Sequence, residues 1–432
     1  MWESCWDRRE IPRFERLNGD KKTDVLIIGG GIAGLLCAYW LERSGVDYIL
    51  CEADRICSGI TKSTTAKITS QHGLIYAKLV REFGVDKARL YFEANEDAVN
   101  EYRRICENID CNFENKDSFV YSRNNLREIE NELAAISKLG YRAEFAESLP
   151  LPFSTVGAVK FHGQAQFDPL KFAAHISEGL KIFEHSGIKE LIGNTAITDM
   201  GKIEAEKIIV TSHFPFINKH GCYFVKMYQH RSYVIALEGA KEVDGMYVDA
   251  SQNGLSFRNY GKYLLLGGGS HRTGKKGGCW QELEEFADKY YPYSQVRYRF
   301  ATQDCMTLDG VPYIGQYSKN TPNMFVATGF NKWGMTSSMV AGKLLADAVS
   351  GKENKYSSVF DTSRTVFRAQ LGANLFETAI NFAIPTTKRC PHLGCALKWN
   401  GQERSWDCPC HGSRFDEHGQ LIDNPSTDDI DI

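Results

Sequence analysis

Two short clusters of cysteine and histidine near the end of the sequence have the composition of a metal-binding site. The first is CPHLGC, which begins at Cys390, and the second is CPCHGSRF, which begins at Cys408. Thiolates and neutral imidazoles are ligands for both zinc and iron. A zinc site would need two cysteines and two histidines, and it would leave Cys395, Cys410 and Ser413 without a role.

The ligand spacing closely resembles that of a Rieske [2Fe–2S] protein, in the form Cys390-x-His392 and Cys408-x-x-His411. In that family two thiolates hold one iron and two imidazoles hold the other, which raises the reduction potential. The resemblance implies that these four residues are the ligands of a [2Fe–2S] cluster.

The same resemblance implies roles for residues beside the ligands. Cys395 and Cys410 match the pair that joins the two cluster loops by a disulfide in cytochrome bc-type Rieske proteins. Ser413 is placed to donate a hydrogen bond to a bridging sulfide. Phe415 stands where high-potential members carry a tyrosine, so one hydrogen bond that raises the potential is expected to be missing.

The stretch TDVLIIGGGIAG, near the other end, is typical of a dinucleotide-binding strand, turn and helix. Gly29, Gly31 and Gly34 form the pattern G-x-G-x-x-G. These glycines permit a tight turn, a close approach to a pyrophosphate, and close packing of helix on strand. A second strand ends in an acid that can accept hydrogen bonds from a ribose. The expected contacts are Gly29, Gly31, Ile32, Ala33, Gly34 and Glu52. The motif alone does not separate FAD from NAD.

The segment TLDGVPYIGQYSKNTPNMFVATGFNKWGMTSS resembles the closing segment of the D-amino-acid-oxidase-like flavoproteins. In that family an Asp-Gly-x-Pro-x-Ile-Gly stretch, here beginning at Asp309, precedes a strand and a glycine-rich turn beside the flavin. The resemblance therefore implies FAD. We expect non-covalent binding, because Cys305 lies closer to the Asp-Gly pair than the flavin-linked cysteine of sarcosine oxidases does. The expected contacts here are Gly329, Trp333, Gly334, Met335 and Thr336.

The segments between the two motifs contain further candidates. GITKSTTAKITSQHG resembles a loop that follows the ribose acid in one subgroup of these flavoproteins, and Thr64, Thr65 and Lys67 offer donors for pyrophosphate. His72 is a candidate catalytic residue near the flavin, and a structural histidine is the alternative. Arg258 lies near a strand end and is a candidate for fixing a substrate anion, and an exposed strand residue is the alternative.

The order of these motifs predicts an α/β fold: a Rossmann-like FAD-binding domain with an inserted antiparallel-sheet substrate domain, followed by an abbreviated Rieske unit. We expect the cluster loops to pack on the flavoprotein body, turned toward FAD, because no flexible linker precedes them. The expected segments are residues 1–150 and 301–350 for the FAD-binding domain, 151–300 for the substrate domain with a strand near 206–212 returning to the FAD-binding domain, 351–384 for a helical connector, and 385–432 for the Rieske unit.

Composition limits the partners. The chain has 24% charged and 43% hydrophobic residues and a formal net charge of −3, which gives no electrostatic case for nucleic acid. No apolar run reaches the length of a membrane span. Cysteines such as Cys37 and Cys106 are scattered through the chain as reduced thiols usually are, so we expect a cytoplasmic protein.

Together the motifs predict a redox enzyme. It would oxidise, or reduce, a small amine or amino-acid-like substrate at FAD and relay electrons through the cluster to an electron carrier. The alternative is an electron-transfer or redox-sensing module with no substrate of its own. A substrate pocket beside the flavin favours the enzyme, whereas a filled flavin face favours the module.

Overall fold

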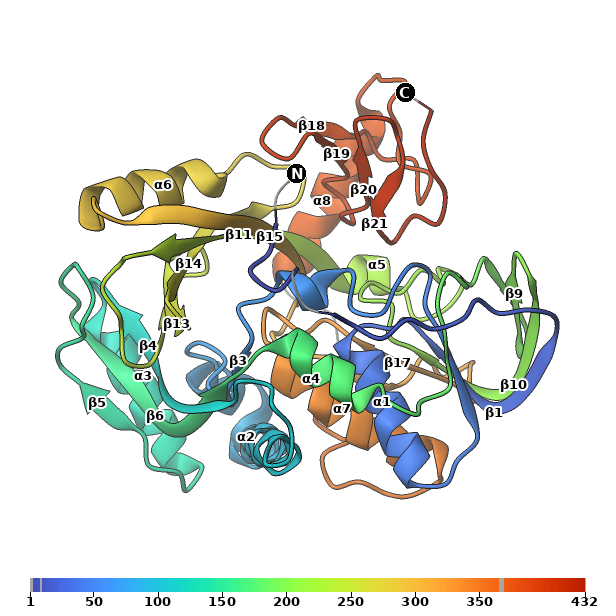
Figure 1. Cartoon of the computed structure of the whole chain (residues 1–432), viewed down its shortest axis with the longest axis horizontal. Helices are drawn as coiled ribbons and strands as arrows, with labels where there is room; N and C mark the ends of the chain where they lie inside the picture. The colour runs from blue at the N-terminus through green and yellow to red at the C-terminus, as the bar shows by residue number, and fades with distance from the viewer. Residues whose placement is uncertain (1–2, 8–9, 365–368, 432) are drawn as a thin grey trace.

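The computed structural model describes residues 3–7, 10–364 and 369–431. Figure 1 shows two larger parts side by side and a small C-terminal unit above the place where they meet. Each part is built on its own sheet, of eight, nine and four strands. The expected class, an α/β nucleotide-binding fold with an additional sheet and a small cluster unit, is confirmed.

The eight-stranded sheet contains the glycine motif. Its order is β16-β17-β10-β1-β2-β7, and β9 and β8 extend from β10. The pairs from β17 to β7 are parallel, so the carboxyl ends of β1 and β2 lie at one edge. The strands are β1 (Lys21–Ile28), β2 (Tyr48–Cys51), β7 (Ile182–Phe183), β8 (Glu190–Ile192), β9 (Thr195–Thr198), β10 (Gly201–Val210), β16 (Tyr313–Gln316) and β17 (Met324–Thr328).

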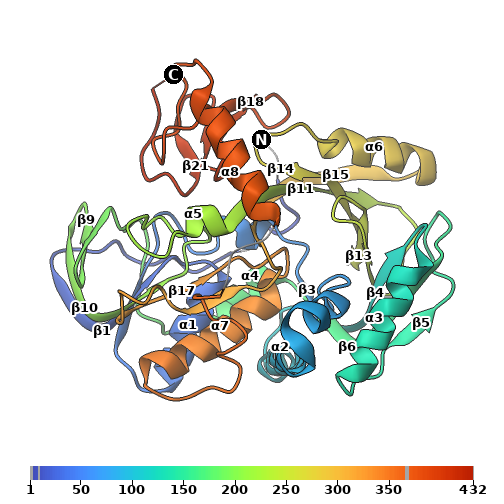
Figure 2. The same cartoon turned by 180° about the vertical axis from the view of Figure 1, so that it is seen from behind.

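Two helices follow the glycine-rich turns of this sheet and pack on each other. They are α1 (Ile32–Arg43) and α7 (Gly334–Val349). Gly342 permits the contact, because a Cβ there would lie 3.0 Å from the backbone of Leu36 in α1. Figure 2 shows the two helices side by side below the sheet. The segment 206–212, where a strand was expected, overlaps the end of β10, which pairs with β1 and β17 in this sheet.

The nine-stranded sheet has the order β15-β11-β14-β13-β12-β4-β6-β3, with β5 on β6, and only its β12–β4 pair is parallel among the pairings described. Its strands are β3 (Lys67–Ile68), β4 (Glu114–Ser122), β5 (Glu144–Ala146), β6 (Gly157–Gln166), β11 (Met227–Glu238), β12 (Met246–Asp249), β13 (Ser256–Tyr260), β14 (Tyr263–Arg272) and β15 (Gln295–Thr307). Helices and turns around the two sheets are η1 (Ile60–Ser63), α2 (Tyr76–Cys106), α3 (Leu126–Lys138), α4 (Pro169–Ile176), α5 (Tyr223–Lys226) and α6 (Cys279–Tyr290).

The sheet membership differs from the expected boundaries at 150 and 300. β3, β4 and β5 precede residue 150 but belong to the nine-stranded sheet, and β15 extends beyond residue 300. The physical reason is that β4 and β5 pair with β6, and β15 with β11, through hydrogen bonds between distant segments. Local composition does not show such pairing.

The C-terminal unit is a sheet of four short antiparallel strands in chain order. They are β18 (Lys398–Asn400), β19 (Ser405–Asp407), β20 (Arg414–Asp416) and β21 (Leu421–Asp423). The helix α8 (Ala369–Ala383) lies within the expected helical connector and runs from α5 toward this unit (Figure 2).

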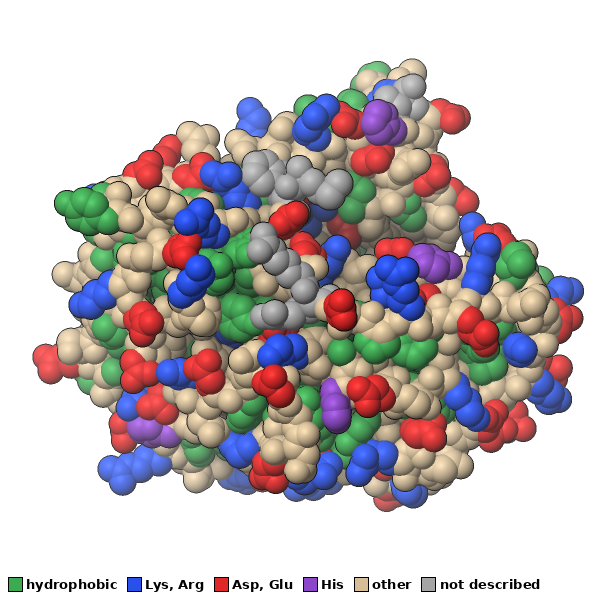
Figure 3. Space-filling model, viewed as in Figure 1, with side chains coloured by type: hydrophobic (Ala, Val, Ile, Leu, Met, Phe, Trp, Pro, Cys, Tyr) green, Lys and Arg blue, Asp and Glu red, His purple; other side chains and the backbone are tan. Residues whose placement is uncertain are grey.

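No helix of the described residues has the length and hydropathy needed to cross a bilayer. Figure 3 shows basic and acidic side chains intermixed over the face in view. That face therefore has no extended positive surface of the kind that attracts nucleic-acid phosphates.

Candidate active site and metal centre

The turn from β1 into α1 has no room for a side chain at Gly29 or at Gly34. Gly29 has a φ of +108°, and a Cβ there would lie 2.9 Å from the carbonyl oxygen of Thr211. A Cβ on Gly34 would lie 1.9 Å from the carbonyl oxygen of Gly29. Glu52, at the end of β2, accepts a hydrogen bond from the Gly30 N–H at 2.6 Å. The acid is thus fixed at the carboxyl edge of the sheet, where a ribose would lie.

A cavity of about 1360 Å³ extends from this turn to the nine-stranded sheet. It exceeds the roughly 300–1,000 Å³ of ordinary ligand pockets, so it has room for a dinucleotide and a second molecule. Gly34 and Thr336 were also predicted contacts, but they are not among the residues that line it. The predicted cofactor residues and the candidate histidine that line it are Gly29, Gly31, Ile32, Ala33, Glu52, Thr64, Thr65, Lys67, His72, Gly329, Trp333, Gly334 and Met335.

The far wall of the cavity is polar and includes residues that the sequence did not single out. Ser232 of β11, Ser270 of β14 and Thr302 and Asp304 of β15 face the cavity. Residues two apart on a strand share a face, which is why Thr302 and Asp304 are exposed together. The segment from Leu421 to Thr427 closes the wall at the C-terminal unit.

His72 lies at the cavity wall with both ring nitrogens already engaged. Its Nδ1 lies 2.6 Å from the Tyr91 hydroxyl, and its Nε2 lies 2.8 Å from the Thr69 carbonyl oxygen and 2.9 Å from the Thr336 hydroxyl. The ring stacks on Trp333 at 5.1 Å. Burial lowers the pKa of His72 to about 3, so the imidazole is neutral. This geometry favours the structural alternative, in which His72 holds the start of α7.

Arg258 does not lie among the residues that line the cavity, contrary to the expectation that it fixes a substrate anion. The side chain is fully buried, and its Nη1 donates to the Ala66 carbonyl oxygen at 2.9 Å. The guanidinium lies over the rings of Trp6 and Tyr260. Burial lowers its pKa to about 10. The sequence placed Arg258 near a strand end but did not show which face of the strand it occupies.

Lys67 is a partly buried amine in the predicted pyrophosphate loop. Its Nζ donates to the Thr65 hydroxyl at 3.0 Å. Burial, with a smaller contribution from Arg258, lowers the pKa of Lys67 to about 7. Thr64 is held by the Trp6 indole, which donates to its carbonyl oxygen at 2.9 Å. The loop therefore presents fixed polar groups and an amine to the cavity, as a dinucleotide site requires.

The four predicted cluster ligands converge in the C-terminal unit. The rings of His392 and His411 lie 5.0 Å apart. Both Nδ1 atoms are buried and make no hydrogen bond within the described part of the chain. Burial lowers the pKa of His392 to about 4 and of His411 to about 3, so both are in the neutral form that binds metal. A hydrogen bond from Cys408 lowers the pKa of the Cys390 thiol to about 7. Two orphaned nitrogens beside two thiols fit a [2Fe–2S] cluster.

The predicted disulfide between Cys395 and Cys410 is present. The sulfurs of both residues lie within 4.8 Å of each other and of the Cys408 sulfur. These three do not form a ligand set, because a disulfide sulfur is not a thiolate. Ser413 contacts the Cys390 thiol, and its hydroxyl accepts the Ser426 N–H at 3.0 Å.

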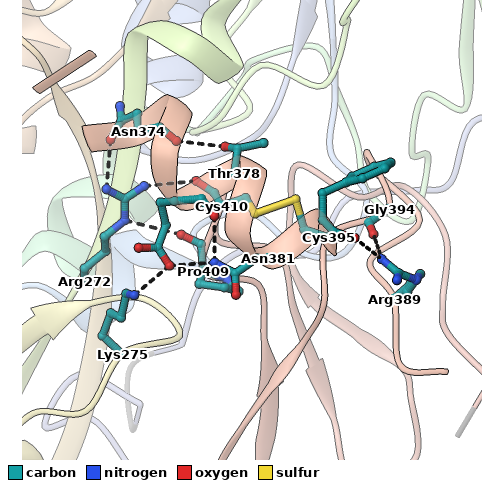
Figure 4. Close-up of a disulfide and its surroundings, with 12 residues drawn as sticks. Arg272, Lys275, Asn374, Thr378, Asn381, Arg389, Gly394, Cys395, Pro409 and Cys410 are labelled. Atoms are coloured by element: carbon teal, nitrogen blue, oxygen red, sulfur yellow. Dashed lines mark hydrogen bonds and ion pairs between the residues drawn. A yellow bond between two sulfur atoms is a disulfide. The ribbon is translucent and has the colours of Figure 1, made fainter. Parts of the chain in front are cut away.

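The cluster loops pack directly on the nine-stranded sheet, as the sequence predicted. Arg272 of β14 donates to the Cys410 carbonyl oxygen at 3.4 Å and bonds Asn374 of α8 at 2.8 Å. Figure 4 shows the Arg272 guanidinium between α8 and the second cluster loop. Gln303 of β15 donates to the Gly412 carbonyl oxygen at 2.8 Å. Side chains of the flavoprotein body thus hold the backbone around the cluster.

The nucleotide-binding part also contacts the C-terminal unit. The Nε2 of His392 lies 2.9 Å from the Asn218 Oδ1, which fixes the ring and leaves Nδ1 as its buried nitrogen without a partner among the described residues. Asn424 donates to the carbonyl oxygens of Ser212 and Phe214, at 2.5 and 2.8 Å. Ser212 and Asn424 both line the cavity. The metal centre and the dinucleotide cavity are therefore neighbours.

Comparison with known families agrees with both sites. Residues 24–348 match the family model of FAD dependent oxidoreductases (DAO), and residues 345–432 match that of the Rieske [2Fe-2S] domain. The chain is 35% identical to the Rieske 2Fe-2S iron-sulfur protein YhfW of Bacillus subtilis (strain 168), over 98% of this chain and 95% of that protein. A 37-residue stretch is 49% identical to the cytochrome b6-f complex iron-sulfur subunit of Trichodesmium erythraeum, over 9% of this chain and 21% of that subunit.

Solved structures show the same fold at low identity. Glycine oxidase from Geobacillus kaustophilus superposes with a TM-score of 0.68 at 17% identity, over 80% of this chain and all of that chain. L-proline dehydrogenase from P. horikoshii superposes with a TM-score of 0.67 at 15% identity, over 80% of this chain and 98% of that chain. The chain therefore belongs to the DAO family of FAD-dependent oxidoreductases, and it carries a Rieske [2Fe–2S] domain at its C-terminal end.

Proposed function

We propose that this oxidoreductase oxidises a small amine or amino-acid-like substrate, or reduces the product in the reverse direction, and exchanges the electrons with an external carrier through its cluster. The observation that carries the proposal is the cavity. Its lining runs from Gly29 at the dinucleotide turn to Asp304 on the large sheet and to Asn424 beside the cluster loops. A substrate, a dinucleotide and a metal centre can thus be arranged around one space.

The residues of the chain supply binding and orientation. When bound, FAD accepts two electrons from a C–H bond next to nitrogen, and a [2Fe–2S] cluster carries electrons singly. The glycine turn and Glu52 would hold the adenosine and pyrophosphate end of FAD. Gly334 begins α7, so the unpaired N–H groups of that helix point at the cavity. His72 and Trp333 hold this helix end in place.

The alternative is a redox module that binds no substrate, and it requires a filled space beside the flavin. The far wall consists largely of small polar side chains, among them Ser232, Ser270 and Thr302, and it encloses open volume. That open volume supports an enzyme with its own substrate over a redox module without one. The solved relatives named above include a glycine oxidase and a proline dehydrogenase, which also supports an amino-acid-like substrate.

We also propose a cytoplasmic location. Most free cysteines of the described residues are buried thiols, among them Cys37 and Cys106. They are typical of a reducing compartment. The Cys395–Cys410 disulfide is buried, which protects it from reductants.

Anaerobic mixing of the holoprotein with a panel of amino acids and amines tests the proposal. At least one compound should bleach the flavin absorption and then produce the electron paramagnetic resonance signal of a reduced Rieske cluster. A Cys408→Ser variant, which lacks a cluster ligand, should still bleach but should not give the second signal. Failure of every panel member to bleach a protein that dithionite does bleach would contradict the proposal.

A further inference from the structure

Two residues of opposite charge, one an acid and one a lysine, lie among those that line the cavity. Asp304 lies on β15 and Lys332 lies in the turn before α7. A backbone bond brings their segments together, because the Asn331 N–H donates to the Cys305 carbonyl oxygen at 3.0 Å. The Asn331 side chain reinforces this junction by accepting the Thr307 N–H at 2.7 Å. Asp304 comes directly before Cys305, and Lys332 comes directly after Asn331. The two charged residues therefore flank this junction.

Asp304 differs from the other acids that line the cavity. Its backbone pairs with His230 in the sheet, but within the described residues its carboxylate makes no hydrogen bond and no ion pair within 4.0 Å. Each of the others already has a partner in the protein. Those acids are Glu52 (Gly30 N–H), Asp54 (His185), Asp199 (Arg16 and Lys189), Asp249 (Ser251 N–H) and Asp423 (Arg414).

The surroundings of Asp304 do not neutralise it. Its cross-strand neighbour is His230, whose pKa is lowered to about 3 by burial, so that ring is neutral. Burial raises the pKa of Asp304 to about 6, and the charges of Lys332 and Arg231 only partly oppose this effect. Above that pH the carboxylate is charged and has no hydrogen-bonded partner. Such a group needs a cation.

Lys332 lines the same cavity but forms no ion pair with Asp304 within 4.0 Å. Its Nζ donates to the Gln252 carbonyl oxygen at 3.3 Å, which leaves donors of the ammonium free for a ligand. Its φ of +74° is a left-handed conformation that follows Asn331 at +51°. Two successive non-glycine residues in this conformation are costly. They aim the turn, and the lysine with it, toward the cavity.

We infer that Asp304 and Lys332 form a two-charge recognition site for a zwitterionic substrate, an α-amino acid or N-alkyl amino acid, with the ammonium on Asp304 and the carboxylate on Lys332. This inference rests on the proposed function and names its substrate class. Arg258, the cation that sequence reasoning favoured for the carboxylate, lies outside the cavity lining.

The test measures binding and charge preference, not turnover. Oxidised holoenzyme is mixed with matched probes, and the shift in flavin absorption is recorded before any bleaching. The sets are glycine, methylamine and acetate; L-alanine, ethylamine and propionate; and L-proline, pyrrolidine and tetrahydrofuran-2-carboxylate. In the wild type the zwitterion of at least one set should bind more tightly than its amine and its acid.

Two variants separate the charges. Asp304→Asn should weaken the binding of zwitterions and of amines by roughly 10- to 100-fold, because it removes one charge-assisted hydrogen bond, and it should leave the binding of acids unchanged. Lys332→Gln should weaken the binding of zwitterions and of acids and leave the binding of amines unchanged. Asp304→Glu and Lys332→Arg keep each charge and should keep the preference. Asp244→Asn and Lys116→Gln are matched controls, because Lys116 of β4 pairs with Asp244, which precedes β12, outside the cavity lining.

Three results would overturn the inference. The first is that the wild type prefers the zwitterion in none of the sets. The second is that both variants lose the same affinity for zwitterion, amine and acid, and the third is that neither variant loses affinity for any of them. These results differ from a failure of the proposed function. Bleaching by an amine that does not depend on Asp304 or Lys332 removes only the inference. Charge-selective binding without any bleaching removes only the proposed reaction.

Discussion

Glu403 holds the cluster unit on the flavoprotein body, and its removal should loosen that unit selectively. The carboxylate accepts hydrogen bonds from Arg231 of β11 (Nε, 3.0 Å), Arg414 of β20 (Nη2, 2.7 Å) and the Tyr233 hydroxyl (2.8 Å). The Glu403 side chain is 8% exposed, and those of the two arginines are 3% and 5% exposed. One buried acid therefore joins two buried cations from the two sides of the interface.

The size of the effect follows from the pKa. Burial opposes the charge, but Arg231 and Arg414 lower the pKa of Glu403 from its ordinary 4.5 to about 2. A depression of that size corresponds to about 3 kcal/mol at neutral pH. Because the folded pKa is the lower one, this stability is present above about pH 4.5 and disappears as the pH falls toward 2. Three kcal/mol is about a hundredfold in an equilibrium constant.

Amide hydrogen exchange of Glu403→Gln at neutral pH measures the prediction. Exchange in β18 to β21 should accelerate by about a hundredfold, because the unit opens more often, while β10 of the other sheet should be unchanged. Glu417→Gln is the matched control. Glu417 pairs with Arg404 on the surface of the same unit, where a bridge contributes about 0–1 kcal/mol.

The pH dependence gives a second readout of the same perturbation. In the wild type, the protection factor of the unit, which is the intrinsic exchange rate at each pH divided by the observed rate, should fall between about pH 4.5 and 2, and Glu403→Gln should lack that step. If Glu403→Gln accelerates exchange no more than Glu417→Gln does, the buried network does not stabilise the docked unit and the reasoning is refuted.

Four further outcomes are expected. Gly34→Ala should abolish FAD binding, because its Cβ would lie 1.9 Å from a backbone oxygen, whereas Gly372→Ala, which meets no atom within 4 Å, should leave the flavin absorption per chain unchanged. Acid precipitation should release the flavin, because the Cys305 thiol is buried, donates a hydrogen bond to the Gln229 side chain and is not among the residues that line the cavity. Yellow colour in the pellet would contradict non-covalent binding. His411→Cys should lower the cluster potential, because a thiolate adds negative charge; stoichiometric zinc without iron in the wild type would contradict the cluster itself. The fragment 385–432 should not fold alone with iron and sulfide, because its core is small; dispersed amide signals from a cluster-bearing fragment would contradict it.

The sequence was most informative where chemistry constrains neighbouring residues. The cluster ligands and the disulfide occur in two loops of a few residues, so their spacing is visible without the fold. The glycine turn is similar, because the approach of Gly34 to Gly29 is a local steric requirement. The family resemblance added FAD, which the turn alone did not distinguish from NAD.

The sequence was least informative where the role of a residue depends on which face of a strand it occupies. Arg258 and Asp304 both lie on strands of the large sheet, yet Asp304 faces the cavity and Arg258 is buried under Trp6. Both strands carry mixed polar and apolar residues, so alternation did not show which side is inward. The Glu403 network was equally hidden, because its members come from β11 and the C-terminal unit, about 170 residues apart.

The abbreviation of the cluster unit explains why its docking is so polar. The core of the unit is small, formed by four cysteines with Leu397 and Phe415, and its strands have three residues each. Such a unit cannot cover its own loops, so β11, β14 and β15 of the body do so, through Arg231, Arg272 and Gln303. The same strands carry the far wall of the cavity. Because one sheet supports both sites, the cluster is held at a fixed place relative to the cavity. The proposed relay of electrons would depend on this arrangement.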